Sequence, residues 1–195
     1  SDPLTLITAK EPSMKNQGLG SWIARRRVKS EGDIAIVHRD RSYRYEEFAD
    51  RIDRLAAALS AGGVAKGDRI VYLGNNHPDF LTTLFDCGVL GAIFVPLNTR
   101  LAPRELEHMI EDSSARVLVV HEEQRELARA AAWSSGIERR IVVDGPPEAP
   151  AVEALDDVLR AASPTSAAAE VSLDDPAMIL YTSGTTGRPK GAVLT

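Results

Sequence analysis

The stretch of sequence that decides the fold is Ala177-Met-Ile-Leu-Tyr-Thr-Ser-Gly-Thr-Thr-Gly-Arg-Pro-Lys-Gly-Ala-Val-Leu194. An apolar run ends at Tyr181, a segment of glycines and hydroxyl-bearing residues follows, and a second apolar run starts at Ala192. Pro189 disfavours helix at Arg188, and the residues after Gly191 favour β structure. The pattern therefore predicts a strand, a loop and a second strand.

The loop between the two predicted strands has the composition that a polyphosphate needs. Gly184 and Gly187 let backbone N–H groups approach phosphate oxygens closely. Lys190 adds a full positive charge. Hydrogen bonds to a charged partner contribute roughly 1.5–3 kcal/mol each. Further donors come from four hydroxyls, those of Thr182, Ser183, Thr185 and Thr186.

The loop differs from the best-known phosphate-binding motif. That motif has the spacing Gly-x4-Gly-Lys-Ser/Thr and leads into a helix. Here Pro189 precedes the lysine and Gly191 follows it. We therefore expect a phosphate-holding hairpin, not a loop at a helix N-terminus.

Upstream, short apolar runs alternate with amphipathic stretches. Continuous apolar strands that alternate with helices predict an α/β fold with a layered parallel sheet covered on both faces. Ligands of such sheets bind at the carboxyl ends of the strands. The apolar runs are 70–73, 93–95, 117–120, 141–143 and 178–181, and helical spacing of apolar residues occurs near 80–85, 106–110 and 127–133.

Residues before and after this alternation are less regular. Residues 1–20 predict an irregular arm, and Ile34–His38 with Ser42–Tyr45 predict two short strands. A helix should follow, with Phe48 and Leu59 on its apolar face and Gly62 and Gly63 at its end. Residues 144–176 predict connecting loop around a short helix near 152–161.

Composition excludes several classes of function. The formal net charge is −5, which gives no bulk attraction to nucleic acid. The single cysteine, Cys87, lies in an apolar run and predicts a buried core thiol. No apolar run approaches the roughly 20 residues that span a bilayer, and no signal peptide is visible at Ser1. We therefore expect no integral membrane segment and a cytoplasmic location.

The stretch Tyr181–Gly191 resembles the signature phosphate loop of the adenylate-forming superfamily, which includes acyl-CoA and aryl-CoA synthetases, luciferase and the adenylation domains of peptide synthetases. The resemblance extends upstream through Ser42–Tyr45, Gly67–Val71, Asn76–Phe80 and Gly91–Asn98. The run Val95-Pro-Leu-Asn-Thr-Arg-Leu101 is most similar to bacterial fatty acyl-CoA and aryl-CoA ligases. These blocks cover about residues 20–195.

The resemblance implies a two-step reaction. A carboxylic acid, a fatty acid being favoured, attacks the α-phosphate of ATP to give an acyl-adenylate and pyrophosphate. The thiol of coenzyme A then displaces AMP. Mg²⁺ bridges the phosphates, and the hydroxyl of Thr182 is a candidate Mg²⁺ ligand. The implied nucleotide contacts are Thr182, Ser183, Gly184, Thr185, Thr186, Gly187, Arg188, Pro189 and Lys190.

The same resemblance sets the expected domain organisation: an arm (1–20), an amino-terminal α/β subdomain (21–170) and a phosphate-loop hairpin that begins the next subdomain (171–195). Family members continue with a magnesium glutamate, a ribose-binding aspartate and a small carboxyl-terminal domain that brings a lysine to the transition state. We find no catalytic residue with these roles in the sequence, and we expect the 195-residue chain by itself not to catalyse the reaction.

Other readings of the motif stay open at this point. The acid is a fatty or an aryl acid, and the acceptor is coenzyme A or, in an acyl-AMP ligase, a carrier protein. A non-catalytic nucleotide-binding or interaction module is a further alternative of a different class. The identity of the acceptor separates a CoA ligase from an acyl-AMP ligase. Turnover separates both enzymes from the non-catalytic module.

The remaining polar and aromatic residues have ordinary structural expectations. His77 precedes a predicted helix and is expected to cap it or face solvent. The segment Asn98–Arg100 predicts a turn. Three histidines are expected at the surface, namely His38, His108 and His121, and two tryptophans are expected as core anchors, Trp22 and Trp133. A solvated acidic helix face is expected from Glu105, Glu107, Glu111 and Asp112.

Overall fold

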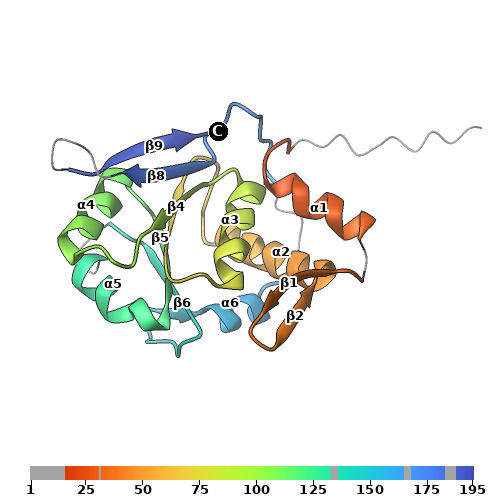
Figure 1. Ribbon diagram of the computed structural model, residues 1–195, viewed down its shortest axis with the longest axis horizontal. Coiled ribbons are helices and arrows are strands. Elements are labelled where there is room, and N and C mark those ends of the chain that lie inside the picture. Colours follow the sequence, from red (N-terminus) through yellow and green to blue (C-terminus); the bar gives the residue numbers. More distant parts are fainter. Residues whose placement is uncertain (1–15, 31, 133–135, 165–167, 183–187) are drawn as a thin grey trace, which may run out of the picture.

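The computed structural model describes residues 16–30, 32–132, 136–164, 168–182 and 188–195. Its centre is a seven-stranded sheet of order β7-β6-β5-β3-β4-β8-β9 between two layers of helices (Figure 1). All neighbouring pairs are parallel except β8 and β9, which are antiparallel. The predicted α/β class with a layered parallel sheet is confirmed.

The strands of this sheet coincide with the apolar runs of the sequence. In the centre, Val71 of β3 lies between Val95 of β4 and Leu118 of β5. The bounds are β3 Arg69–Leu73, β4 Ile93–Leu97, β5 Val117–His121, β6 Arg139–Val143, β7 Glu153–Ala154, β8 Met178–Thr182 and β9 Lys190–Leu194.

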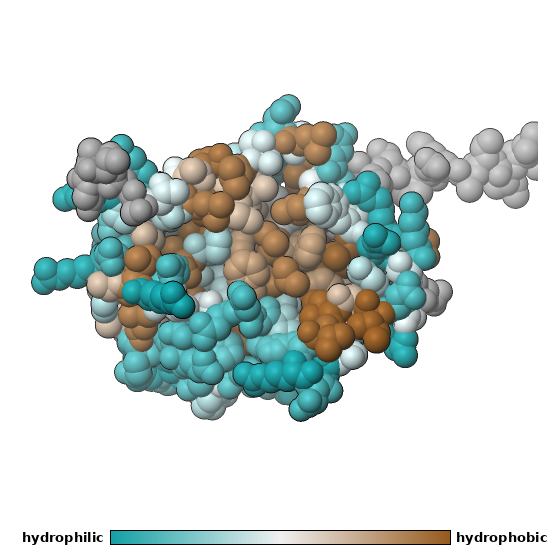
Figure 2. Space-filling model, viewed as in Figure 1, coloured by the Kyte–Doolittle hydropathy of each residue, from teal (hydrophilic) through white to brown (hydrophobic). Residues whose placement is uncertain are grey.

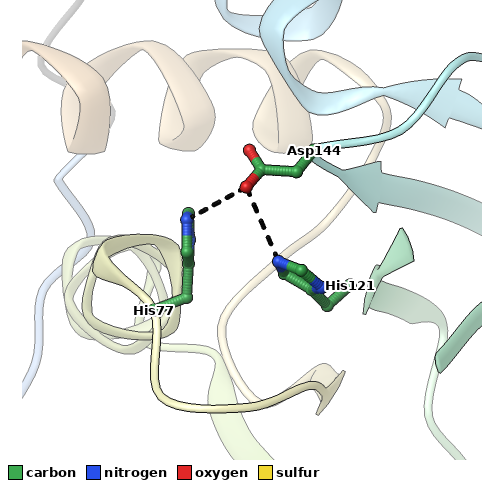
Figure 3. A group of neighbouring side chains, drawn as sticks. All are labelled: His77, His121 and Asp144. Carbon is green, nitrogen blue, oxygen red and sulfur yellow. Dashed lines mark ion pairs between the residues drawn. The ribbon is translucent and has the colours of Figure 1, made fainter. Parts of the chain in front are cut away.

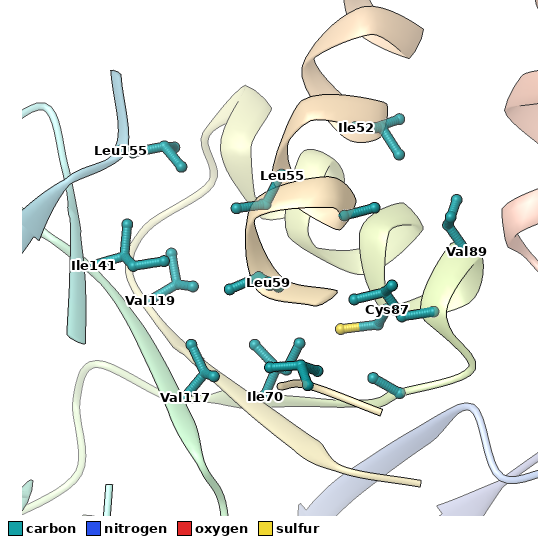
Figure 4. Close-up of a cluster of buried hydrophobic side chains, with 14 of the residues drawn as sticks. Ile52, Leu55, Leu59, Ile70, Cys87, Val89, Val117, Val119, Ile141 and Leu155 are labelled. Carbon is teal, nitrogen blue, oxygen red and sulfur yellow. The ribbon is translucent and has the colours of Figure 1, made fainter. Parts of the chain in front are cut away.

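Alternate residues of the central strands enter two separate cores, because successive side chains of a strand point to opposite faces. Ile70 and Tyr72 of β3 pack under one helical layer, whereas Val71 and Leu73 pack under the other. Figure 4 shows part of the first core, with Leu55 and Leu59 of α2 and Cys87 of α3 packed over the strands. The first layer comprises α1 Gly20–Lys29, α2 Tyr45–Ala61, α3 Pro78–Leu90 and α6 Leu155–Ala161; the second comprises α4 Pro103–Ser113 and α5 Arg125–Ala132, which follows the 3₁₀ turn η1 Glu122–Gln124.

A separate two-stranded antiparallel sheet precedes α2. It consists of β1 Ile34–His38 and β2 Arg41–Arg44, joined at Arg39, which has a φ of 52°. The sequence placed Tyr45 at the end of the second strand, but this residue begins α2. The hairpin itself is confirmed.

Two helices of the first layer end at glycines, because glycine adopts a positive φ at little cost. Gly63 follows α2 with a φ of 85°, and Gly91 caps α3 with a φ of 66°. A Cβ at Gly91 would lie 2.9 Å from Cγ of Lys66. The predicted stop at Gly62–Gly63 is thus confirmed, with Gly63 as the left-handed residue.

Several expectations are corrected. Trp22 is not a core anchor: its side chain is 54% exposed, because α1 buries Gly20, Ser21 and Ile23 against the rest of the protein. The two-residue strand β7 was missed, and the helix expected over 152–161 begins later, at Leu155. Trp133 lies outside the described residues.

Other expectations are confirmed. Cys87 is a buried free thiol. Within Asn98–Arg100 the amide of Arg100 donates to Asn98 Oδ1 at 3.0 Å, so this segment is a turn. In the part of the chain that the structure covers, no helix combines the length and the apolar character needed to cross a bilayer.

Candidate phosphate-binding hairpin

The candidate site is the hairpin of β8 and β9 at one edge of the sheet. Tyr181 pairs with Gly191, and Thr182 pairs with Lys190 in the antiparallel register. Lys190 therefore begins a strand and not a helix. The two strands predicted on either side of the loop are confirmed, and a helix that begins at Lys190 is excluded.

One face of the hairpin is fastened to α4 by Tyr181. Its Oη donates its one proton to Asp112 Oδ2 at 2.7 Å and lies 3.1 Å from the carbonyl oxygen of Met109. Burial and the neighbouring Asp112 carboxylate raise the pKa of Tyr181, so the hydroxyl keeps its proton and remains a donor. Asp112, which the sequence assigned to a solvated acidic face, is exposed but also serves as this acceptor.

Gly191 leaves room for that anchor. A Cβ built on Gly191 would lie 2.8 Å from Cγ2 of Ile179 and 3.4 Å from the ring of Tyr181. A side chain at this position would push against the strand that carries the tyrosine. The glycine that ends the sequence motif thus has a packing reason on the face opposite the proposed phosphates.

The other face of the hairpin carries two of the predicted nucleotide contacts. Residues directly opposite each other in an antiparallel pair project to the same face, so the Thr182 hydroxyl and the Lys190 ammonium share one face of the ladder. Both residues are exposed. Together they form a donor and a cation at the end of the hairpin where the glycine-rich loop begins and ends.

The structure brings some predicted site residues together and leaves others undescribed. Arg188 is exposed and Pro189 is half-buried, next to Lys190. Ser183, Gly184, Thr185, Thr186 and Gly187 lie outside the described residues. The predicted role of all nine residues in nucleotide binding, and of Thr182 in Mg²⁺ binding, therefore stays a prediction.

Apolar side chains of the hairpin also reach solvent. Leu180, Val193 and Leu194 are 37%, 57% and 45% exposed. Figure 2 shows hydrophobic residues gathered near the carboxyl end of the chain, over β8 and β9. The hairpin contrasts in this respect with the enclosed central strands.

Two polar residues at the carboxyl edge of the sheet were missed. His121 was expected at the surface but is buried, since it ends β5 between β3 and β6. Asp144, directly after β6, faces it across the edge. Their position at the carboxyl ends of buried apolar runs, directly after Val120 and Val143, was the signal that could have found them. His77 caps α3 as expected, its Nδ1 accepting from the Asp79 amide, and burial lowers the pKa of His77.

The fold and the hairpin agree with the comparison to known proteins. The chain belongs to the family of AMP-binding enzymes, whose family model matches residues 23–195. It is thus a member of the adenylate-forming enzymes, as the signature loop indicated.

Three similar proteins place the chain more closely. A feruloyl-CoA synthase of an Amycolatopsis species is 46% identical over 182 residues, which are 93% of this chain and 34% of that protein. The long-chain-fatty-acid–CoA ligase FadD13 of Mycobacterium tuberculosis is 34% identical over 188 residues, covering 93% and 35% of the two chains. The crystal structure of the anthranilate CoA ligase AuaEII in complex with anthranoyl-AMP matches with a TM-score of 0.83 and 28% identity, over 90% of this chain and 34% of that one. The chain therefore spans about a third of the length of the curated relatives it matches.

Proposed function

We propose that this chain holds the phosphates of ATP in a ligase that joins a carboxylic acid to coenzyme A through an acyl-adenylate. The observation that carries the proposal is the pairing of Thr182 with Lys190. It sets a hydroxyl and an ammonium group on one exposed face of the hairpin, at the two ends of the glycine- and threonine-rich loop.

The proposed chemistry follows from what these groups can stabilise. The carboxylate of the acid attacks the α-phosphorus of ATP, and the bond to pyrophosphate breaks. Lys190 offsets the negative charge on the departing phosphates, a charge-assisted contact that is stronger than a neutral hydrogen bond. The thiol of coenzyme A then attacks the acyl carbon and releases AMP.

Mg²⁺ fits this arrangement as a shared ion. It prefers six oxygen ligands and keeps several waters, so it is usually bound through one or two protein groups and the substrate phosphates. The exposed hydroxyl of Thr182 offers one such oxygen. When bound, the ion would neutralise phosphate charge, and Thr182 would be the residue of this chain that holds it.

The acid is the least constrained part of the proposal. An aromatic acid of the hydroxycinnamate kind is the first candidate, supported by the 46% identity to a feruloyl-CoA synthase. A long-chain fatty acid, which the sequence of residues 95–101 indicated, is the second, supported by the 34% identity to FadD13. The acceptor is proposed to be coenzyme A, and a carrier protein is the alternative.

The test is thioester formation by the full-length protein. A hydroxycinnamate and a long-chain fatty acid are each supplied with ATP, Mg²⁺ and either coenzyme A or a phosphopantetheine carrier protein. Lys190→Ala should lower kcat/KM for adenylation by about 10²–10³-fold, as loss of one transition-state donor does. Lys29→Ala, which removes an exposed lysine of α1, should leave the rate unchanged. Equal rates for both variants would contradict the proposal.

The 195-residue chain alone is predicted to be inactive. Calorimetric titration of ATP into the chain shows whether the chain binds the nucleotide without turnover or does not bind it at all. Robust pyrophosphate release that depends on ATP would refute the predicted inactivity, and ATP binding without turnover in the full-length protein would favour a non-catalytic nucleotide-binding module.

A further inference from the structure

A cluster of two imidazoles and one carboxylate lies at the carboxyl edge of the sheet, apart from the β8–β9 hairpin. His77 follows β3, His121 ends β5 and Asp144 follows β6, so three different strand ends contribute (Figure 3). Within the described residues, one potential ligand atom from each of the three lies within 4.8 Å of the others. The side chains of His77 and His121 are 10% and 8% exposed, whereas that of Asp144 is 49% exposed.

We propose that His77, His121 and Asp144 bind a divalent first-row transition metal, with Zn²⁺ as the first candidate. Neutral imidazole nitrogens combined with a carboxylate are a ligand set that suits zinc and its neighbours. Mg²⁺ and Ca²⁺ prefer oxygen ligands throughout. The donor chemistry therefore selects the class of metal.

The distances within the cluster fit a shared ion better than direct hydrogen bonds. Asp144 Oδ2 lies 3.3 Å from His77 Nε2 and 3.6 Å from His121 Nε2. Both values exceed the roughly 2.7–2.9 Å of a charge-assisted N–H···O bond. Two tetrahedral ligands at about 2.0–2.2 Å from zinc lie about 3.3–3.6 Å apart. Small side-chain rotations would complete the set.

Asp79 offers its carboxylate to the tautomer of His77 that binds metal. Coordination through Nε2 requires the proton on Nδ1, which gives up the hydrogen bond from the Asp79 amide at 3.2 Å and places that proton toward Asp79 Oδ2, 3.5 Å from Nδ1. Asp79 is itself held in place, because its Oδ1 accepts from Arg51 Nη2 at 2.7 Å and from the Thr82 hydroxyl at 3.1 Å. A histidine oriented by a fixed carboxylate is the usual second layer of a zinc site.

Converting His121 to the tautomer with its proton on Nδ1 costs little free energy. Its Nδ1 accepts from the Glu123 amide at 3.4 Å, a long and weak hydrogen bond. Asp144 is held toward the histidines by a left-handed backbone conformation, with a φ of 55°. Aspartate tolerates that region better than most residues, and such conformations concentrate at functional sites.

The position in the sheet supports a ligand site independently. The chain leaves β3 toward α3 on one face and leaves the neighbouring β5 toward α5 on the other. Ligands of open α/β sheets bind at such a switch point, outside the carboxyl ends of the strands. A cavity of about 380 Å³ bordered by His77 and Asp144 gives access for the ion and a fourth, water ligand. Four aspartates line that cavity against three arginines, so a cation is not opposed by an excess of positive charge.

The test is a titration of the full-length protein, without an oligohistidine tag, with Co²⁺ followed by displacement with Zn²⁺. We expect one equivalent of Co²⁺ to give the absorption bands of a tetrahedral or five-coordinate site. Zn²⁺ at about 100 times its dissociation constant should raise Tm by roughly 2–4 °C in a protein about three times as long as this chain, since it binds the folded state alone.

Asparagine substitutions remove the ligands while they keep the local backbone. Asn is a good N-cap residue for positions 77 and 121 and tolerates the left-handed conformation of position 144. His77→Asn, His121→Asn and Asp144→Asn should each weaken Co²⁺ binding at least about 100-fold, the upper end of what loss of a supporting residue costs. His38→Asn is the matched control: its ring lies 4.9 Å from that of His77, but it is outside the ligand set.

Unfolding transitions without metal establish that each variant is folded. The proposal is overturned if the wild type shows no saturable binding. It is equally overturned if His38→Asn loses as much affinity as the three ligand variants, or if the ligand variants fold and bind like the wild type.

Discussion

The central strands and the β8–β9 hairpin belong to one sheet but differ in how far they are buried. All five residues of β5 are buried, whereas all five of β9 are exposed. β5 has helices on both faces and strands on both edges, while β9 is the last strand of the sheet. The enclosed half buries the core, and the open hairpin leaves the hydroxyl of Thr182 and the ammonium of Lys190 exposed, as the proposed nucleotide binding requires.

The largest effect is expected in the enclosed half. Phe94 of β4 is 0% exposed and packs edge to face against Phe80 at 5.1 Å. Phe94→Ala should destabilise the fold by about 3–5 kcal/mol, because it removes buried area and leaves a cavity. Val193→Ala in β9 should cost less than about 1 kcal/mol, since Val193 is 57% exposed. Urea unfolding of both variants checks the difference, and similar losses of stability would break the comparison.

The next effect concerns activity and not stability. Thr182→Val keeps the shape and β-branching of the side chain but removes the hydroxyl of an exposed residue. We expect kcat/KM for adenylation in the full-length protein to fall by about 10–100-fold, which matches the roughly 1.5–3 kcal/mol of a hydrogen bond to a charged group. Unfolding free energy should stay within about 0.5 kcal/mol, as for most surface substitutions. A stability loss without a loss of rate would assign Thr182 to the fold instead.

A third substitution tests the packing around Tyr181, which fastens the hairpin to the enclosed half. Gly191→Ala should destabilise by about 1–2 kcal/mol, because its Cβ would lie 2.8 Å from Ile179 Cγ2 and crowd the Tyr181 ring. In the Gly191→Ala variant, hydrogen exchange should show that β8 and β9 open faster than β3. Ala192→Ser, one residue along β9 at an exposed position, serves as the control and should change little. Unchanged exchange in Gly191→Ala would mean that Tyr181 does not need this space.

A different kind of effect is a pH slope set by one carboxyl group of the enclosed half. Asp86 in α3 is fully buried, and no hydrogen-bond partner for either oxygen occurs within the described residues. Burial raises the pKa of Asp86 well above its ordinary value. Above about pH 4, unfolding releases a proton, so stability falls as pH rises, by up to about 1.4 kcal/mol per pH unit until the folded-state pKa is passed.

Asp86→Asn should remove this slope, because the amide cannot ionise. Urea unfolding of wild type and variant between pH 5 and pH 8, compared with an Asp50→Asn control at a half-buried position of α2, measures it. Parallel stability curves for wild type and Asp86→Asn would show that Asp86 is ionised in the folded protein.

The sequence predicted the enclosed half well for a physical reason. Strands buried on both faces must be apolar throughout, so runs such as Ile70–Leu73 and Val117–Val120 stand out without knowledge of the tertiary structure. The strand β7 escaped because its two residues, Glu153 and Ala154, carry no such pattern and depend on pairing with β6.

Single side chains were harder to predict than elements. Helical spacing does not reveal which side of a ten-residue helix such as α1 meets the protein, so Trp22 was assigned to the core although Ser21 and Ile23 are the buried neighbours. His121 looked like an isolated polar residue, because its partners His77 and Asp144 come from other strand ends. The hairpin at Tyr181–Gly191 was predicted from local chemistry alone, since proline restricts the backbone before it and glycine permits a tight turn, whatever surrounds them.

The central claim is that the β8–β9 hairpin, and not the enclosed strands, receives the nucleotide. Hydrogen exchange of the full-length protein with and without MgATP tests it most directly. The account predicts slower exchange in the segment 178–194 and no change in the segment 117–121. Protection that spares 178–194, or that appears equally in both segments, would contradict it.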